Sequence, residues 1–314
     1  MSVIRVCFLG TPDFAAQHLK MLLADDHYEV VGVVTQPDRP AGRKMQLTAS
    51  PVKTLALEHN LPVVTPENLR KDPETTALIH SWGAEVAVVV AFGQILSQSF
   101  LDSFEIGAVN VHGSLLPKWR GAAPIQRSIE AGDTVTGVSL QRMVKKLDAG
   151  PVIGERRVNL TDEITATELY EKLAVLGCDL LHIELMDFIR GNLAPIEQDE
   201  TKVTVAPKIE KEESLLDWKF PAKTLHNKVR AFTMGPGTFV LFQGKRLKIH
   251  RTRVVDCTGS APVGSIVLLG PDELLIQTGD GQLSLLEVQP ESKLKLSISE
   301  FLKSLSLKKG DAFV

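Results

Sequence analysis

The sequence lacks the cysteine patterns of a disulfide-linked or zinc-bound protein. Only three of its 314 residues are cysteines, and Cys7, Cys178 and Cys257 are scattered along the chain. No C-x-x-C, C-x-x-H or H-E-x-x-H spacing occurs, so neither a disulfide framework nor a Cys/His metal site is predicted. Because free thiols fit a reducing compartment, we expect a cytoplasmic protein that uses no metal.

Long hydrophobic runs are also missing. The longest, Val86 to Phe92, is far too short to cross a bilayer, which takes about 20 apolar residues. The first residues show neither a charged segment followed by a long apolar stretch nor a small-residue cleavage site. We therefore expect no membrane association and no secretion signal.

Two phosphate-binding fingerprints are absent as well. The turn after the first expected strand reads Gly10-Thr11-Pro12-Asp13, without the second glycine of G-x-G-x-x-G that lets a pyrophosphate approach the backbone. No G-x-x-x-x-G-K-[ST] sequence occurs either. These absences disfavour a nicotinamide-dependent dehydrogenase, a kinase and an NTPase.

The composition that remains is that of an ordinary globular protein, and its charge is unevenly distributed. The length favours two domains. Residues 1–208 carry 20 basic and 26 acidic side chains, whereas residues 209–314 carry 15 and 12. The stretch from Lys211 to Arg253 alone has ten basic and three acidic residues. Such a stretch hints at a polyanionic partner, although clustered lysines are more often a solvated face.

The first half alternates short apolar runs with helical patterns. Several runs are nearly continuous in Val, Ile and Ala, as in parallel strands covered on both faces. We expect strands at Ile4–Gly10, Glu29–Thr35, Leu61–Val64, Glu85–Phe92 and Gly107–His112, and helices at Asp13–Ala24, Ser50–Asn60 and Pro73–Trp82. A strand pair at Gly137–Met143 and Pro151–Asn159 and a long helix over Thr165–Arg190 follow. The pattern predicts a doubly wound, Rossmann-like α/β domain over residues 1–191.

The second half has a different pattern. Residues 192–208 are polar and contain proline, which is typical of a linker. After them come short β runs separated by Gly, Pro and Asp turns. Residues 209–314 are therefore expected to form a small β-barrel, OB-like and antiparallel, of the kind that binds nucleic acids.

Asn110 and His112 are the strongest candidates for chemistry. Side chains two apart on a strand share a face, and this strand end is the place where ligands of open α/β sheets bind. Asp148 is the third candidate, in a tight turn that ends at Gly150-Pro151. From the pattern alone such residues are more often structural than catalytic, and their spacing does not show that they meet.

The run from Asn110 to Gln126, NVHGSLLPKWRGAAPIQ, resembles the signature of the methionyl-tRNA formyltransferase family. Further resemblances lie at Gly10–Ala15, Gln36–Arg43 and Leu147–Pro151, and at Arg230-Ala231-Phe232 followed by Pro236-Gly237. These matches span the whole chain in order. The chain departs from the family pattern at Val205 and at Thr233-Met234-Gly235, which lie at or beyond the expected linker.

The resemblance implies a cytoplasmic enzyme that transfers a formyl group from 10-formyltetrahydrofolate to the amino group of initiator methionyl-tRNA. It implies no metal and no obligate protein partner. The family's catalytic set corresponds to Asn110, His112 and Asp148. Formyl transfer passes through a tetrahedral oxyanion, which the Asn110 amide and a His112 imidazolium can stabilise, while Asp148 supports that charge and helps to move the proton.

The resemblance also implies where the substrates bind. The folate is expected along Ser114, Leu115, Leu116 and Pro117 and beside Phe92 and Ile95. The segment from Gln36 to Lys53 is basic, and within it Arg43 is expected to contact the acceptor stem of the tRNA. From the residues alone, Phe92 is equally explained by core packing and the basic segment by a solvated surface loop.

Two alternatives stay open at this point. The same chemistry could serve another acceptor, such as a glycinamide nucleotide, an amino-sugar nucleotide or water. A protein of a different class, a tRNA-binding module without catalysis, would not need the Asn110, His112 and Asp148 set.

Overall fold

The computed structural model describes residues 3–41, 45–257, 259, 261–303 and 307–313. The chain forms two compact units, and each unit is assembled from several stretches of sequence. The first comprises Met1–Gly121, Thr136–Val158 and Tyr170–Val205, and the second Ala122–Val135, Asn159–Leu169 and Ala206–Val314. The two units therefore interleave along the chain.

The first unit is built on a seven-stranded sheet with the order β10-β9-β7-β6-β1-β2-β5. Its strands are β1 (Ile4–Gly10), β2 (Tyr28–Val34), β5 (Val63–Val64), β6 (Val86–Val90), β7 (Gly107–His112), β9 (Val135–Arg142) and β10 (Val152–Asn159). Strands β5, β2, β1, β6 and β7 are parallel, and β9 runs antiparallel to β7. The Rossmann-like core expected from the sequence is thereby confirmed.

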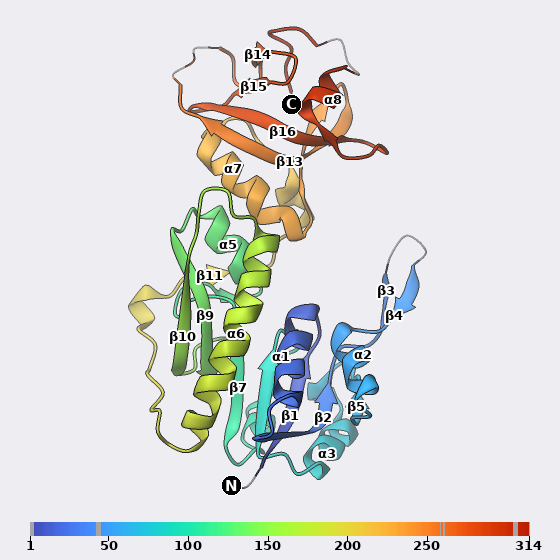
Figure 1. Ribbon diagram of the computed structural model, residues 1–314, viewed down its shortest axis with the longest axis vertical. Coiled ribbons are helices and arrows are strands. Elements are labelled where there is room, and N and C mark those ends of the chain that lie inside the picture. The colour runs from blue at the N-terminus through green and yellow to red at the C-terminus, as the bar shows by residue number, and fades with distance from the viewer. Residues whose placement is uncertain (1–2, 42–44, 258, 260, 304–306, 314) are drawn as a thin grey trace. The chain divides into compact units, whose positions relative to one another are not determined.

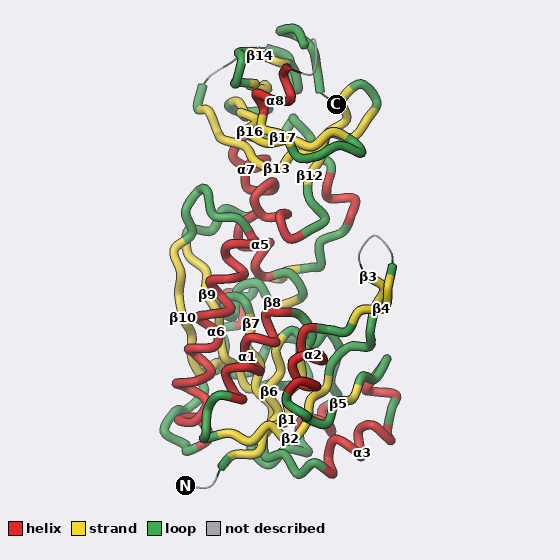
Figure 2. Tube along the Cα trace, turned by 45° about the vertical axis from the view of Figure 1, so that its right-hand side comes forward, coloured by secondary structure: helices red, strands yellow, loops and turns green. Residues whose placement is uncertain are grey.

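Helices flank this sheet (Figures 1 and 2). They are α1 (Asp13–Leu23), α2 (Pro51–Glu58), α3 (Pro73–Ser81), α4 (Gln98–Leu101) and most of α6 (Ala166–Ile189). Every residue of β6 and β7 is buried, which explains their continuous apolar runs. One face, with Cys7 and Leu9 of β1, packs on residues of α3 and α4 such as Ile79 and Phe100.

The second unit contains an antiparallel sheet with the order β12-β13-β16-β15-β14, and β17 pairs with β16. Its elements are α5 (Pro124–Glu130), α7 (Ala222–Ala231), β12 (Thr238–Phe242), β13 (Lys245–Val255), β14 (Ile266–Leu269), β15 (Leu274–Gln277), β16 (Gln282–Pro290), β17 (Leu296–Ser297) and α8 (Ile298–Lys303). Trp218, Leu225 and Val240 belong to its buried core. A C-terminal domain of antiparallel strands, as expected from the sequence, is confirmed.

The basic segment from Gln36 to Lys53, expected to be a loop, contains a hairpin. Strands β3 (Arg39–Ala41) and β4 (Gln46–Thr48) pair antiparallel and project from the rest of their unit (Figures 1 and 2). Arg43 lies outside the described residues. None of the helices described is long and apolar enough to cross a membrane.

Candidate active site

The carboxyl ends of two neighbouring parallel strands form the base of the site. Strands β6 and β7 pair with Val89 opposite Asn110, and β9 pairs on the other side of β7 with Gln141 opposite Asn110. Asn110 and His112 are 8% and 6% exposed, so both are almost fully buried. The Asn110 side chain makes no hydrogen bond to any residue that the structure describes, which leaves its amide available to a ligand.

The His112 ring is hydrogen-bonded through one nitrogen and faces a carboxylate with the other. Nε2 lies 2.9 Å from the carbonyl oxygen of Trp119, and because a carbonyl can only accept, Nε2 must carry a hydrogen. Nδ1 lies 3.7 Å from Oδ2 of Asp148, an ion-pair separation rather than a direct hydrogen bond. A carbonyl on one nitrogen and a carboxylate near the other suit the doubly protonated imidazolium.

Asp148 occupies a strained turn that fixes its carboxylate. Its φ is 47°, in the left-handed region, and its Oδ2 accepts a hydrogen bond of 2.9 Å from the backbone N–H of Gly121. Oδ1 accepts a longer bond, 3.2 Å, from Nε2 of Gln141. A Cβ at Gly150 would stand 1.7 Å from the carbonyl oxygen of Arg142, so only glycine lets the turn close this tightly.

Two glutamines beside Asp148 were not among the residues predicted from the sequence. Besides donating to Asp148, Gln141 has a buried Oε1 without a partner in the described structure. Gln198 donates from Nε2 to the carbonyl oxygens of Asp148, at 2.8 Å, and Gly150, at 2.6 Å. Gln198 therefore clamps both sides of the turn from a segment that the sequence marked only as a linker.

The clamp is itself supported by charged side chains. Buried Arg120 donates from Nε and from its terminal nitrogen to Oε1 of Gln198, at 3.0 and 2.8 Å. Arg120 also pairs with Glu200 at 2.8 Å, and Lys146 pairs with the same carboxylate at 2.6 Å. Hydrogen bonds from Arg120 and then Lys146 lower the pKa of Glu200 to about 2. Glu200 thus stays ionised, and Arg120 keeps a fixed orientation toward Gln198.

The loop after β7, predicted to line the folate site, is stabilised by its own side chains. The Ser114 hydroxyl is fully buried and donates to the carbonyl oxygen of Lys118 at 2.6 Å. The Ser139 hydroxyl donates to the Ser114 carbonyl and accepts from the Leu116 N–H. A cis peptide bond joins Leu116 and Pro117. Since the Ser114 hydroxyl is used within the loop, a ligand here would meet mainly backbone groups and Leu115.

The two other folate candidates differ in exposure. Phe92 is 2% exposed and belongs to the hydrophobic core, while its carbonyl oxygen accepts hydrogen bonds from Thr11 and Gln36. Ile95 is 68% exposed. Ile95 is therefore free to contact a ligand, whereas the Phe92 ring packs inside.

Around Arg43, two of the neighbouring basic side chains have carboxylate partners. Lys53 pairs with Asp38 at 2.8 Å, and Arg39 pairs with Glu67 at 3.1 Å. In the part of the chain that the structure describes, no group of three or more His, Cys, Asp or Glu side chains is arranged as a metal site.

Two family profiles match the chain. One, described as formyl transferase, matches residues 4–183, and the other, described as formyl transferase, C-terminal domain, matches residues 208–306. A methionyl-tRNA formyltransferase of Bdellovibrio bacteriovorus is 61% identical over 314 residues, which cover 99% of each chain. A methionyl-tRNA formyltransferase of Pediococcus pentosaceus is 43% identical over 301 residues, 96% of this chain and 94% of its own.

Solved structures are similar in fold at much lower identity. A sugar 3N-formyl transferase, solved in the presence of dTDP and 5-N-formyl-THF, matches with a TM-score of 0.66 at 18% identity, covering 94% of this chain and all of that chain. HypX from Aquifex aeolicus, in complex with tetrahydrofolic acid, matches with a TM-score of 0.64 at 19% identity, covering all of this chain and 51% of that chain.

Proposed function

The chain belongs to the formyl transferase family, and from that premise we propose that it transfers the formyl group of 10-formyltetrahydrofolate to the amino group of methionyl initiator tRNA. Methionyl-tRNA is proposed as the acceptor because the chain is 61% identical, over 99% of both chains, to a protein named methionyl-tRNA formyltransferase. The donor is supported by folds of the same kind solved with reduced folates. The reaction belongs to the cytoplasm, where charged tRNA is used for protein synthesis.

The first step of the proposed mechanism needs hydrogen-bond donors at the formyl oxygen. The amine attacks the formyl carbon, an N–C bond forms, and the carbonyl oxygen becomes an oxyanion. The unpartnered Asn110 amide and Nδ1 of the His112 ring, which makes no direct hydrogen bond, project from one strand face and would stabilise that charge as donors. Such donors are effective because the strand holds them in place before the reaction, with both side chains largely buried.

The second step moves a proton. The attacking nitrogen must lose one proton, and the folate nitrogen must gain one as its bond to the formyl carbon breaks. Asp148 is held by Gly121 and Gln141 and lies 3.7 Å from His112, so this pair is the proposed route for that proton. The Trp119 carbonyl keeps the ring oriented throughout.

The proposed folate site follows from the loops at this strand end. Backbone groups of Ser114, Leu115, Leu116 and Pro117 would line one side, and the segment that carries Phe92 and Ile95 the other. The buried Phe92 contributes through its position in the backbone, and the exposed Ile95 contributes its side chain.

We assign the binding of the tRNA to Arg43 and to the second unit. Along β13, basic side chains alternate with buried ones, so that Arg246, Lys248, Arg251 and Arg253 are exposed. Two of them have neighbours, since Arg246 covers the Phe239 ring at 4.7 Å and Arg253 lies 3.6 Å from Glu273. Exposed cations along one strand suit a phosphate backbone.

We assign the chemistry to residues 1–191, the tRNA affinity to residues 209–314 together with Arg43, and a connecting role to residues 192–208. The hydrogen bonds of Gln198 add to this last segment a role in supporting the Asp148 turn.

One assay tests the proposed function. The protein is incubated with 10-formyltetrahydrofolate and charged initiator tRNA, and the product is searched for formylmethionine. Elongator methionyl-tRNA and an amino-sugar nucleotide are offered in parallel reactions as alternative acceptors. We expect formylation of the initiator tRNA. Formylation of the sugar nucleotide alone, or hydrolysis of the donor without any acceptor, would overturn the proposal.

A further inference from the structure

The carbonyl that orients the His112 ring belongs to a residue in a strained conformation. Nε2 of His112 donates to the Trp119 carbonyl oxygen at 2.9 Å. The φ of Trp119 is 62°, in the left-handed region, which a residue with a bulky side chain seldom adopts. Such a conformation persists only where the surrounding structure fixes it. The orientation of the His112 ring therefore depends on the groups that fix the backbone at Trp119.

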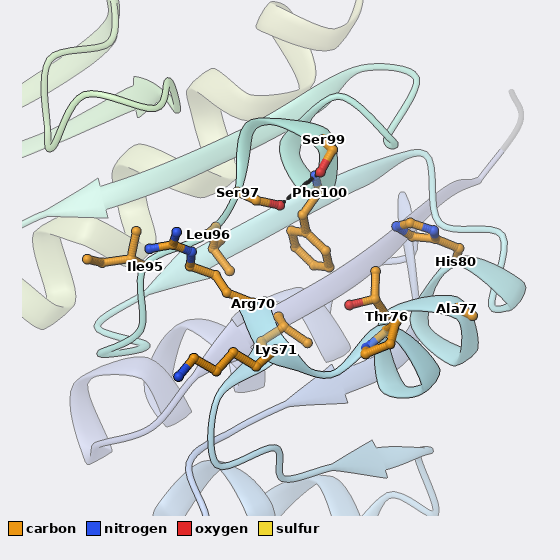
Figure 3. Close-up of a pocket in the computed structure, with 12 residues that line it drawn as sticks. Arg70, Lys71, Thr76, Ala77, His80, Ile95, Leu96, Ser97, Ser99 and Phe100 are labelled. Carbon is orange, nitrogen blue, oxygen red and sulfur yellow. Dashed lines mark hydrogen bonds between the residues drawn. The ribbon is translucent and has the colours of Figure 1, made fainter.

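These groups do not belong to the cavity that Figure 3 shows. That cavity, of about 500 Å³, is lined by residues 69–71, by residues of the helix α3 and by residues 95–100, and neither His112 nor Trp119 contributes to its lining. The backbone at Trp119 is instead held from two sides, by the loop after β7 and by a residue of the segment 192–208.

From the loop, the support reaches the peptide group before Trp119. The Ser114 hydroxyl donates to the Lys118 carbonyl oxygen at 2.6 Å, and the Lys118 N–H donates to the Leu115 carbonyl oxygen at 3.0 Å. The Lys118 carbonyl and the Trp119 N–H belong to one planar peptide group, so the bond from Ser114 holds one end of that group. Its other end, the Trp119 N–H, is bonded outside the loop.

Thr204 holds both of the peptide groups that flank the Trp119 α-carbon. Its hydroxyl oxygen accepts from the Trp119 N–H at 2.9 Å, and its carbonyl oxygen accepts from the Arg120 N–H at 2.9 Å. The Arg120 N–H and the Trp119 carbonyl share the second planar group, so they turn together, and this is the carbonyl that bonds to His112. Because φ and ψ of Trp119 are set by these two planes, the bonds to Thr204 keep the strained conformation in place.

We propose that Thr204 is a positioning residue of the active site, which acts on His112 through the backbone of Trp119. The inference rests on the proposed function in giving His112 a part in formyl transfer. Without the hydroxyl, the Trp119 N–H loses this acceptor, and the backbone there can relax toward a common conformation. The ring then loses the orientation that presents Nδ1 to Asp148 and to the formyl oxygen. The chemical step therefore slows, while the groups that bind the substrates stay in place.

The test removes the Thr204 hydroxyl while keeping the shape of the side chain. Thr204→Val should lower kcat by about fivefold, in line with one lost hydrogen bond. The KM for the folate donor and the KM for methionyl-tRNA should each stay within about twofold of the wild-type value. Thr204→Ser keeps a hydroxyl and should recover most of kcat. Thr201→Val makes the same change at an exposed threonine of the same segment, whose hydroxyl bonds to Asp199 at 2.6 Å, and this matched control should keep the wild-type constants.

A spectroscopic measurement follows the His112 ring directly. In substrate-free protein labelled with ¹⁵N-histidine, the hydrogen on Nε2 should exchange slowly with water, because the ring is buried and bonded to a carbonyl. It should therefore give an NMR signal, which is assigned by its absence from His112→Asn. Thr204→Val should lose this signal, and Thr204→Ser should keep it.

The proposal is overturned by a Thr204→Val protein, folded by circular dichroism, that keeps either the wild-type kcat or the ring signal. Equal losses in Thr204→Val and Thr204→Ser would overturn it as well. Thr204→Ala takes the place of the valine variant if the latter does not fold. A wild-type ring hydrogen that exchanges at once with water would overturn the proposal without any variant. A wild type that formylates no tRNA would overturn the proposed function, and the ring signal would still decide the role of Thr204.

Discussion

At the scale of single residues, the three candidate catalytic side chains differ in whether the protein already supplies their hydrogen-bond partners. His112 and Asp148 are each held by protein groups, whereas the Asn110 amide has no partner in the described structure. Neither polar atom of that amide is among the fully enclosed side-chain atoms that lack a partner, so the amide reaches the accessible part of the site. The unpaired state of Asn110 therefore fits a donor that waits for a developing charge.

Replacing Asn110 with alanine should affect the chemical step more than the fold. We expect Asn110→Ala to lower kcat by about 10²–10³, because one preorganised donor to the oxyanion is lost. The KM for the folate donor should change little, since the interaction forms mainly in the transition state. Steady-state formylation of initiator tRNA measures both constants. A variant with near wild-type kcat at saturating substrates would show that Asn110 has no such role.

A second residue-scale prediction concerns stability and pH. Burial lowers the pKa of His18 to about 4, against an opposing hydrogen bond from its Nδ1 to the Phe14 carbonyl. Its Nε2 is buried without a partner among the residues described. This nitrogen lies against Gly177 of α6, where an added Cβ would stand only 2.4 Å from it. Above pH 6.5 the neutral ring is favoured in the folded and unfolded chains alike, so the full stability is present there.

As the pH falls from 6.5 to about 4, His18 takes up a proton in the unfolded chain but stays neutral in the folded one. This difference should cost about 3 kcal/mol of unfolding free energy. The His18→Leu variant should lack this pH-dependent contribution. The difference in unfolding free energy between wild type and variant should therefore change over this pH interval. Urea unfolding at several pH values measures it. Parallel stability curves for wild type and variant would contradict the prediction.

At the scale of elements, the Asp148 turn depends on a segment 50 residues away. Gln198→Leu removes the donor to two carbonyls and leaves Arg120 without its amide partner, so we expect lower stability by about 1–3 kcal/mol and a reduced kcat. Gln198→Glu is the matched variant, since it can still accept from Arg120 but cannot donate to the carbonyls. Both variants should shift the pH profile of kcat if the turn positions Asp148. Unchanged profiles together with lost stability would leave Gln198 a purely structural role.

Elements buried on both faces could be predicted from the sequence. The strands β1 and β7 begin and end at the expected residues, because their apolar runs end where burial ends. The helix α7 was missed because its buried face includes the polar residues His226, Asn227 and Arg230, which leaves only a narrow apolar stripe. The hairpin of β3 and β4 was missed because its strands have three residues each and contain no long alternating pattern.

The same contrast applies to the site. Asn110 and His112 could be found because a strand period of two places them together. Gln141 depends on the register between β7 and β9, which no local pattern specifies. Gln198 lies in a polar stretch, where an amide gives no signal of its distant partner.

At the scale of the whole molecule, the proposed division of labour predicts opposite responses to salt. Phosphate contacts release counterions, so tRNA affinity should fall steeply as salt is raised, while affinity for the folate donor should change much less. Arg43→Ala should weaken tRNA use more than folate binding. Filter binding and calorimetry on the full chain measure these affinities. Salt-independent tRNA binding would favour a small-molecule acceptor instead.

The interleaving of the two units has a consequence for inheritance. Residues 122–135 lie early in the chain, yet α5 within them packs on α7 of the second unit, and Ile129 is fully buried. Arg127 of α5 also pairs with Glu213 at 2.7 Å. A recombination event near residue 208 would join a foreign α7 to the native α5. Related genes should therefore exchange this end of the coding sequence successfully only when both helices travel together.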